Sequence, residues 1–308
     1  RQRQMCIRDR VKSIDRLGAA HVVATLAAGA QLVAMTPLTG GVSANTYVLD
    51  ASNIGGIPAR WVLREHGASH SGHSAKTEFA LLKTLHQQGL RVPEPMLCDV
   101  SHALSAYDFI VMSYIEGSST IPAESLDHCI AAMAEQLWNI HCLPIEVLPN
   151  LPTRLNPVPE VFDYLPIGSE WSQLHAQMRT LKGTGYQGRP CLLHGDYWPQ
   201  NLLWQHGQIS GILDWEDAAI GDPLSDVAQA SVELRYLFGP AGMEKFITAY
   251  ETFAPVDPQR LALWQVYVAA AAQHFMGDWG LEISRENHMR RVALASIRDA
   301  AAGLPKGR

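Results

Sequence analysis

A change of hydrophobic pattern near residue 118 constrains what this 308-residue chain can fold into. Before it, short apolar runs alternate as strands do, whereas later segments repeat their apolar residues with the period of amphipathic helices. The composition, 47% hydrophobic and 18% charged, is enough to bury a large core. We therefore expect a tail and leading helix over 1–30, a β-rich lobe over 31–117 and a helical lobe over 118–308.

The β-rich lobe is predicted to be a small antiparallel sheet with one helix. Ser74 is a suitable cap for a helix that runs to about Gln88, and Gly89 supplies the left-handed residue that ends it. The expected strands are 31–38, 46–50, 61–65, 96–100 and 109–113.

The helical lobe is interrupted by a predicted hairpin that turns at His206-Gly207 between 202–204 and 209–213. Beyond the hairpin, Asp222 followed by Pro223 indicates the start of a helix that ends at Gly239. The other expected helices are 125–142, 169–181, 241–253, 258–276 and 283–302.

The beginning of the chain has the charge order of a signal peptide, because a basic stretch precedes the apolar run 17–35. That run contains His21 and Gln31 and divides at Gly29 into a helix-like and a strand-like half. We therefore expect a surface helix capped near Ser13, followed by the first strand.

Charge and cysteine content limit the partners and the cellular compartment that we expect for this chain. The net charge of -6 and the lack of a basic stripe disfavour nucleic acid as a partner. Five scattered cysteines without a C-x-x-C pair fit reduced thiols, so we expect a cytoplasmic protein. We also expect no membrane partner and a monomer or homodimer.

Polar residues bracket the predicted hairpin. Asp196 and Asn201 precede it, and Asp214 follows it directly, so that three oxygen-bearing side chains can converge. Phosphoryl transfer needs Mg²⁺ held by hard oxygen ligands and a group that orients the attacking hydroxyl. Asn201 and Asp214 suit the metal, and Asp196 suits the hydroxyl.

The segment from His194 to Asp217 resembles the aminoglycoside phosphotransferase and choline kinase-like family, whose catalytic loop reads H-G-D-x-x-x-x-N and whose metal strand reads I-D-W/F-E. The resemblance continues through 220–223 and 226–228 and covers nearly the whole chain from about residue 31. It implies a bilobal α+β fold of the protein-kinase type and a small-molecule kinase that uses ATP or GTP.

The same resemblance implies roles for individual residues. Asp196 would be the catalytic aspartate, and Asn201 and Asp214 would hold magnesium. Asp226 would buttress the catalytic loop by accepting backbone hydrogen bonds, and His194 would order that loop without titrating. Asp222 would support the loop from the start of its helix.

The β-rich lobe supplies candidates for nucleotide binding. Gly40, Gly41, Ser43 and Asn45 lie between two strands, where backbone N–H groups could cover a triphosphate. In kinase-like folds the positions of Arg64 and Glu78 pair, and the cation grips phosphates; the family often has lysine at position 64. Backbone groups from Ser113 to Ile115 would bind the purine.

Several alternatives remain open or are weakened. No Walker motif is present, and a metal site formed by His66, His70 and His73 is disfavoured because a Gly/Ser loop carries them. A eukaryotic-type protein kinase is disfavoured, because the short path from Asp214 to Asp222 leaves no room for a long activation loop. The serious rival is a nucleotide-binding pseudokinase or sensor that acts through a partner.

The acceptor is not identified by the sequence. Acidic residues of the helical lobe would suit a cationic acceptor such as an aminoglycoside or amino alcohol, although such residues are usually a solvated face. Aromatic residues there could stack on a sugar or quaternary ammonium, although core packing is the more usual role. The candidates are Glu124, Asp127, Glu233, Asp278, Glu282, Trp138, Tyr164, Trp171, Tyr236 and Trp279.

Overall fold

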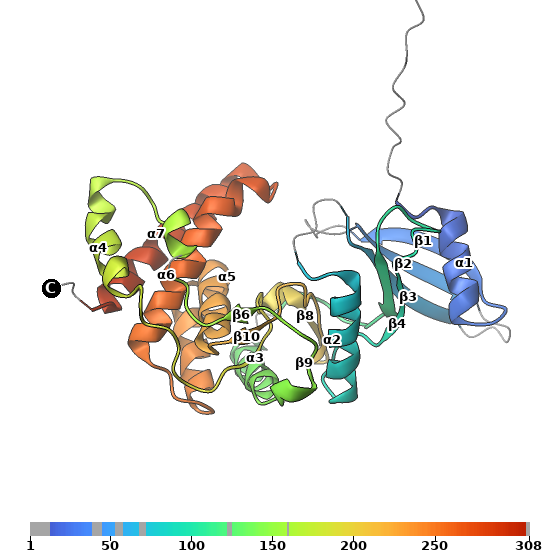
Figure 1. Cartoon of the computed structure of the whole chain (residues 1–308), viewed down its shortest axis with the longest axis horizontal. Coiled ribbons are helices and arrows are strands. Elements are labelled where there is room, and N and C mark those ends of the chain that lie inside the picture. The colour runs from blue at the N-terminus through green and yellow to red at the C-terminus, as the bar shows by residue number, and fades with distance from the viewer. Residues whose placement is uncertain are drawn as a thin grey trace, which may run out of the picture. The chain divides into compact units, whose positions relative to one another are not determined.

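The computed structural model describes residues 13–38, 45–52, 58–67, 72–121, 125–158 and 160–305 (Figure 1). The chain divides into two compact units. The first consists of Arg1–Lys83 and Pro93–Tyr114, and the second of Thr84–Val92 and Ile115–Arg308.

The first unit is built on a five-stranded antiparallel sheet with the order β1-β2-β3-β5-β4. The expected strands and the antiparallel sheet are thus confirmed. Strands β2, β3 and β5 contain β-branched and aromatic residues, which suit a pleated surface. The strands are β1 (Gln31–Leu38), β2 (Asn45–Ser52), β3 (Pro58–Glu65), β4 (Pro95–Asp99) and β5 (Phe109–Ser113).

Helix α1 (Arg16–Leu26) covers one face of this sheet. Its Val22 and Val23 are fully buried against Leu49 and Val111 in one hydrophobic cluster. The cap was expected near Ser13 and is Asp15, two residues further on, which accepts the hydrogen bond from the Gly18 N–H at 2.8 Å.

Helix α2 (Ala75–Gln87) follows the third strand, as expected. The Ser74 hydroxyl accepts a hydrogen bond from the Thr77 N–H at 3.2 Å, which is an N-cap contact. Gly89 has φ of 84°, so the left-handed stop is also confirmed.

The second unit is mainly helical. Its longest element, α5, contains a break at Gly239, where φ is 74° and ψ is −175°, and Pro240 follows. The break separates the two helices that the sequence predicted on either side of it. The α-helices are α3 (Leu126–His141), α4 (Ser172–Thr180), α5 (Leu224–Glu251), α6 (Pro258–Phe275) and α7 (Ile283–Gly303). The 3-10 turns are η2 (Ile145–Val147), η3 (Glu160–Asp163), η4 (Ser169–Trp171), η5 (Pro199–Asn201) and η6 (Met276–Asp278).

Two small sheets lie within this helical unit. The predicted hairpin is present as β8 (Leu202–Gln205) and β9 (Gln208–Ile212). A three-stranded sheet with the order β6-β10-β7 was not predicted from the sequence. Its strands are β6 (Thr153–Arg154), β7 (Cys191–Leu193) and β10 (Ala219–Gly221), and β7 and β10 end directly before His194 and Asp222.

No helix within the described residues combines the length and apolar character that crossing a bilayer requires.

Asp222 joins several elements of the second unit. Its fully buried carboxylate accepts hydrogen bonds from Leu224 N–H at 3.0 Å, from Arg260 Nε at 2.5 Å and from Trp264 Nε1 at 2.6 Å. Arg260 also donates to the carbonyls of Thr184 and Leu155. This carboxylate therefore connects the start of α5 to α6 and, through Arg260, to two loops.

We expect Asp222→Ala to lower the free energy of unfolding of the second unit by about 3–5 kcal/mol, because it leaves the largely buried Arg260 guanidinium without its counter-charge. Asp127→Ala is the matched control, since Asp127 pairs with Lys245 at 2.5 Å with both side chains exposed, 75% and 51%, and we expect a loss of at most about 1 kcal/mol. Urea unfolding followed by tryptophan fluorescence measures both, and equal losses would contradict the role given to Asp222.

Candidate active site

The loop between β7 and β8 adopts a conformation that its glycine makes possible. Gly195 has φ of 87°, and a Cβ atom at this position would lie 2.0 Å from the Asp217 carbonyl oxygen. Only glycine combines this backbone angle with such a close approach. The segment after Asp214 is thereby packed directly against the loop that carries Asp196.

His194 fastens the loop to the end of β9 as a neutral ring. Its Nε2 is 2.9 Å from the Leu213 carbonyl oxygen, and its Nδ1 accepts the Asp196 N–H at 3.3 Å. These contacts place the proton on Nε2. Burial lowers the pKa of His194, and its ring lies 4.5 Å from that of Trp215. The histidine therefore orders the loop rather than exchanging protons.

Asp226 holds the loop backbone from the first turn of α5. Its two carboxylate oxygens accept the His194 N–H at 2.7 Å and the Gly195 N–H at 3.0 Å. Burial alone would raise the pKa of this carboxyl, but His141, with further help from His194 and the Gly195 N–H, holds the pKa below its usual value. The buttress is thus an ionised, fully buried carboxylate.

Both oxygens of the Asp196 carboxylate accept side-chain hydrogen bonds. Oδ2 accepts from Asn201 Nδ2 at 2.9 Å, and Oδ1 accepts from Gln229 Nε2 at 3.0 Å. Burial, followed by the charges of Asp214 and Asp217, raises the pKa of Asp196 to about 7. A carboxyl with such a pKa is suited to accepting a proton near neutral pH.

Asn201 and Asp214 have the chemistry of a magnesium site. The Leu213 N–H donates to the Asn201 carbonyl at 2.8 Å, which fixes Asn201 beside the residue that precedes Asp214. Because the Asn201 Nδ2 already donates to Asp196, its Oδ1 faces away with no hydrogen-bond donor among the described residues. Asp214 has φ of 62°, an uncommon backbone angle for a residue other than glycine.

These two oxygen donors fit magnesium, which is usually held by one or two protein ligands together with substrate phosphates and water. Over the described ranges, no three His, Cys, Asp or Glu side chains form a metal-binding group. An ion at Asn201 and Asp214 would therefore take its remaining ligands from phosphate and water.

In the first unit, Arg64 and Glu78 are brought together. Arg64 Nη1 lies 3.4 Å from one Glu78 oxygen, and His66 Nε2 lies 2.8 Å from the other. All three side chains are largely buried. The sequence did not predict His66 as a member of this cluster, because the contact joins residues that lie 12 positions apart and follows no regular spacing.

Of the other nucleotide-binding candidates between β1 and the start of β2, only Asn45 lies within the described residues. Gly40, Gly41 and Ser43 lie outside the described residues. The Asn45 side chain donates to Ser13 at 3.0 Å and lies 3.4 Å from Glu65, so it is engaged within the sheet.

At the end of β5, the backbone donors that were expected to bind a purine are partly used. The Ser113 N–H donates to the Glu94 carbonyl at 2.8 Å, and the Tyr114 N–H donates to the Arg60 carbonyl at 3.4 Å. Ile115 N–H makes no backbone hydrogen bond with the described residues, so it is the available donor of this segment.

Among the acceptor candidates, Glu233 is distinguished by its position. It is 8% exposed, and no hydrogen bond or ion pair within the described parts of the chain involves its carboxylate. Burial and then the charge of Asp196 raise its pKa to about 8, and the neighbouring charge of Arg285 opposes this. Tyr236, one turn further along α5, is also buried, and its hydroxyl has no partner among the described residues.

The remaining acidic candidates are engaged elsewhere or lack such a setting. Asp127 pairs with Lys245 at 2.5 Å, and Glu282 caps α7 by accepting the Ser284 and Arg285 N–H groups. Glu124 lies outside the described residues. Trp171 is buried, as expected of a core aromatic residue.

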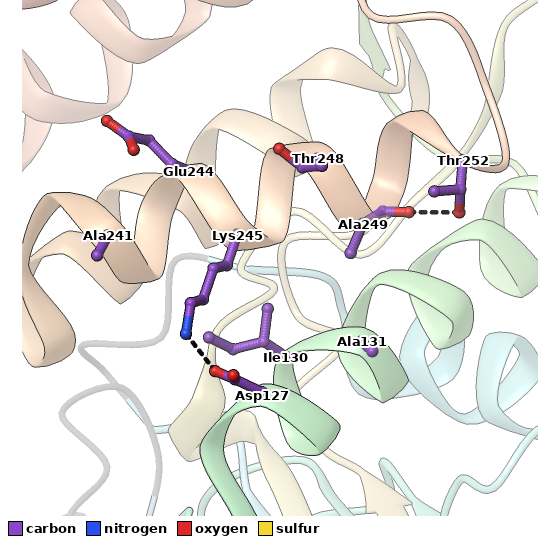
Figure 2. A pocket seen from close by; sticks show the side chains of 9 residues that line it. All are labelled: Asp127, Ile130, Ala131, Ala241, Glu244, Lys245, Thr248, Ala249 and Thr252. Atoms are coloured by element: carbon purple, nitrogen blue, oxygen red, sulfur yellow. Dashed lines mark hydrogen bonds and ion pairs between the residues drawn. The ribbon is translucent and has the colours of Figure 1, made fainter.

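The Asp127–Lys245 pair spans a hollow between α3 and the second half of α5 (Figure 2). The hollow has a volume of about 530 Å³ and is lined mainly by alanines, threonines and aliphatic stems. None of its lining residues belongs to the loop that carries Asp196. It is therefore separate from the cluster of reactive groups.

Residues 34–264 match the phosphotransferase enzyme family. This match spans most of the chain. The chain belongs to the phosphotransferase enzyme family. The polar groups around Asp196 lie inside the matched region.

Curated relatives of this phosphotransferase are distant. Acyl-CoA dehydrogenase family member 10 of Mus musculus is 27% identical over 51% of the chain, and the chain spans only 16% of that protein. Homoserine kinase of Polaromonas naphthalenivorans is 24% identical over 68% of the chain and 72% of the enzyme.

Solved structures share the fold. A putative aminoglycoside phosphotransferase of Ralstonia eutropha has a TM-score of 0.68 at 14% identity and covers 95% of this chain and 99% of its own. A thermostable mutant of aminoglycoside phosphotransferase APH(4)-Ia, in complex with AMP-PNP and hygromycin B, has a TM-score of 0.64 at 16% identity. The match covers 87% of this chain and 94% of that one. The bilobal α+β prediction is confirmed.

The charge on Asp196 should reduce stability, and the effect should depend on pH. Its pKa in the folded protein lies above the unfolded value, so ionisation opposes folding as pH rises from about 4 to about 7. In metal-free protein we expect Asp196→Asn to be more stable than wild type by about 1–3 kcal/mol at pH 8, with a smaller difference at pH 5.

Chemical unfolding at the two pH values measures this difference. Asp299→Asn is the control, because an exposed carboxylate should show little change in its effect between pH 5 and pH 8. A stability difference for Asp196→Asn that is the same at both pH values would rule out the proposed cost of ionisation.

Proposed function

We propose that this phosphotransferase moves the γ-phosphate of ATP or GTP onto a hydroxyl group of a small molecule, with Mg²⁺ as cofactor. The observation that carries the proposal is the Asp196 carboxylate, fixed on both oxygens and placed beside Asn201 and Asp214. A nucleotide-binding pseudokinase would have no use for a carboxylate held in this way.

Asp196 orients the acceptor hydroxyl and takes its proton as the phosphoryl group is transferred. Its raised pKa makes it basic enough to hold that proton near neutral pH. Asn201 and Asp214 would hold Mg²⁺, which when bound neutralises charge on the phosphate oxygens. Because Asp226 fixes the loop backbone before substrate arrives, little rearrangement is needed during the reaction.

In the first unit, Arg64 would contact the phosphates while Glu78 holds it in place. Gly40, Gly41, Ser43 and Asn45 are kept as candidates for covering the triphosphate, and Ile115 is the favoured donor to the base. The complex of APH(4)-Ia with AMP-PNP supports a nucleoside triphosphate as the donor. Use of ATP and magnesium supports a cytoplasmic location, as do the scattered cysteines without a C-x-x-C pair.

We further propose that the acceptor carries a cationic nitrogen. Glu233 is a buried carboxylate without a partner, on the α5 face that also presents Gln229 to Asp196. A bound ammonium group would provide the missing counter-charge and lower the pKa of Glu233. Homoserine kinase and the hygromycin B complex are consistent with an amine-bearing alcohol, and antibiotic resistance is one of the activities to be tested.

A coupled assay of ADP or GDP formation, run over aminoglycosides, macrolides, amino alcohols, sugars and hydroxy acids, tests the reaction. We expect acceptor-dependent turnover, which Asp196→Ala lowers at least about 100-fold while nucleotide binding persists. Asp214→Ala should abolish the magnesium-dependent part of nucleotide affinity, measured by calorimetry with and without the ion. Turnover of Asp196→Ala equal to wild type would remove Asp196 from the mechanism, and a flat screen would favour the pseudokinase.

Glu233→Gln tests the acceptor class. We expect it to raise KM for amine-bearing acceptors about 10–100-fold and to change KM for neutral acceptors little, because only the former lose an ion pair. Glu244→Gln, on the exposed surface of α5 beyond the break at Gly239, is the matched control. If neutral alcohols are the better substrates of the wild type, the cationic acceptor is wrong although the phosphotransfer stands.

A further inference from the structure

One face of α5 makes two kinds of contact with the catalytic loop, one to its backbone and one to the Asp196 side chain. Asp226 and Gln229 are three residues apart, so both side chains lie on the same side of the helix. Asp226 binds the backbone of residues 194 and 195, whereas Gln229 reaches the reactive carboxylate itself. We infer that Gln229 is a positioning residue that sets the orientation of the Asp196 carboxylate. This inference rests on the proposed function of Asp196.

A single hydrogen bond does not fix a carboxylate. The last torsion of an aspartate side chain is broad, so the plane of the two oxygens can turn when only one of them is held. In this site the two oxygens have separate donors, Asn201 Nδ2 at 2.9 Å and Gln229 Nε2 at 3.0 Å. Together they define the plane and still leave each oxygen a lone pair for the acceptor hydroxyl.

The positions of the two donors, Asn201 and Gln229, are fixed by different parts of the structure. Asn201 belongs to the same loop as Asp196, and its other side-chain atom is the proposed metal ligand, so its position depends on the ion. Gln229 comes from α5, which Asp222 anchors to α6 through Arg260 and Trp264. Gln229 therefore supplies a fixed reference for the carboxylate from outside the loop.

An amide suits this position better than a charged group. A lysine or arginine would form an ion pair with Asp196 and reduce its ability to take a proton. A glutamate would add a like charge where Asp214 and Asp217 already act on Asp196. Glutamine donates one hydrogen bond and leaves the charge of the site unchanged.

Gln229→Met tests the inference, because methionine has nearly the same length and lacks a donor. With an acceptor found in the screen, we expect kcat to fall about 10–100-fold. KM for the nucleotide should stay within about twofold, and the thermal midpoint should be close to that of wild type. Gln229→Glu should lower kcat further, because a repelling oxygen replaces the donor.

Gln265→Met is the matched control. Gln265 is on α6, and its Nε2 donates to the Ser231 hydroxyl of α5 at 3.0 Å, so the same amide-to-thioether change removes a comparable bond away from Asp196. We expect its kcat to stay near wild type. A purely structural role of Gln229 would instead lower the thermal midpoint and change KM and kcat together.

The outcomes separate this inference from the proposed function. If wild type transfers phosphate, Asp196→Ala does not, and Gln229→Met has wild-type kcat, the function stands and the positioning role is overturned. A crystal structure of Gln229→Met adds a readout that needs no acceptor. The Asp196 carboxylate should leave the plane that it has with Gln229 present, and an unchanged orientation would overturn the inference.

Discussion

The rest of the site depends on the Asp226 carboxylate accepting the N–H groups of His194 and Gly195. These donors would otherwise be buried without partners, because Gly195 is pressed against the Asp217 carbonyl in a conformation that offers them no regular backbone acceptor. His141 approaches the same carboxylate from α3, and Tyr250 from the end of α5 holds His141 in turn. The loop is thus set by the core of the helical unit and not by its own sequence alone.

On this fixed backbone the chain brings several carboxylates close together. Asp214 and Asp217 both raise the pKa of Asp196, and the charge of Asp196 raises the pKa of Glu233 in turn. The amides of Asn201 and Gln229 stabilise Asp196 without adding a positive charge. Such an arrangement is unfavourable for folding but suits the divalent cation and the cationic acceptor that we propose, because both bring positive charge when substrates bind.

Sequence patterns predicted the elements whose signal is local. The strands follow alternating apolar residues, and Gly89 and Gly239 end helices because they adopt positive φ. Strands β6, β7 and β10 are two or three residues long and carry no period, so they could only be found in the structure. Asp15 and Ser13 are equally suitable caps by residue type, and the choice between them depends on where the helix begins. The contacts of His66 and Gln229 are tertiary, and no spacing rule indicates them.

Helix α5 explains how this fold can keep its chemistry while its acceptor varies. Asp222 anchors its beginning, Asp226 and Gln229 hold the loop, and Glu233 and Tyr236 lie on the following turns. The residues that fix the loop and those proposed to select the acceptor are therefore successive turns of one rigid element. A substitution at position 233 or 236 changes what the helix presents beyond Asp196 and leaves the hydrogen bonds to residues 194–196 in place. In the proposed function, acceptor choice can thus change by single residues, because the geometry of the Asp196 loop is held one turn away.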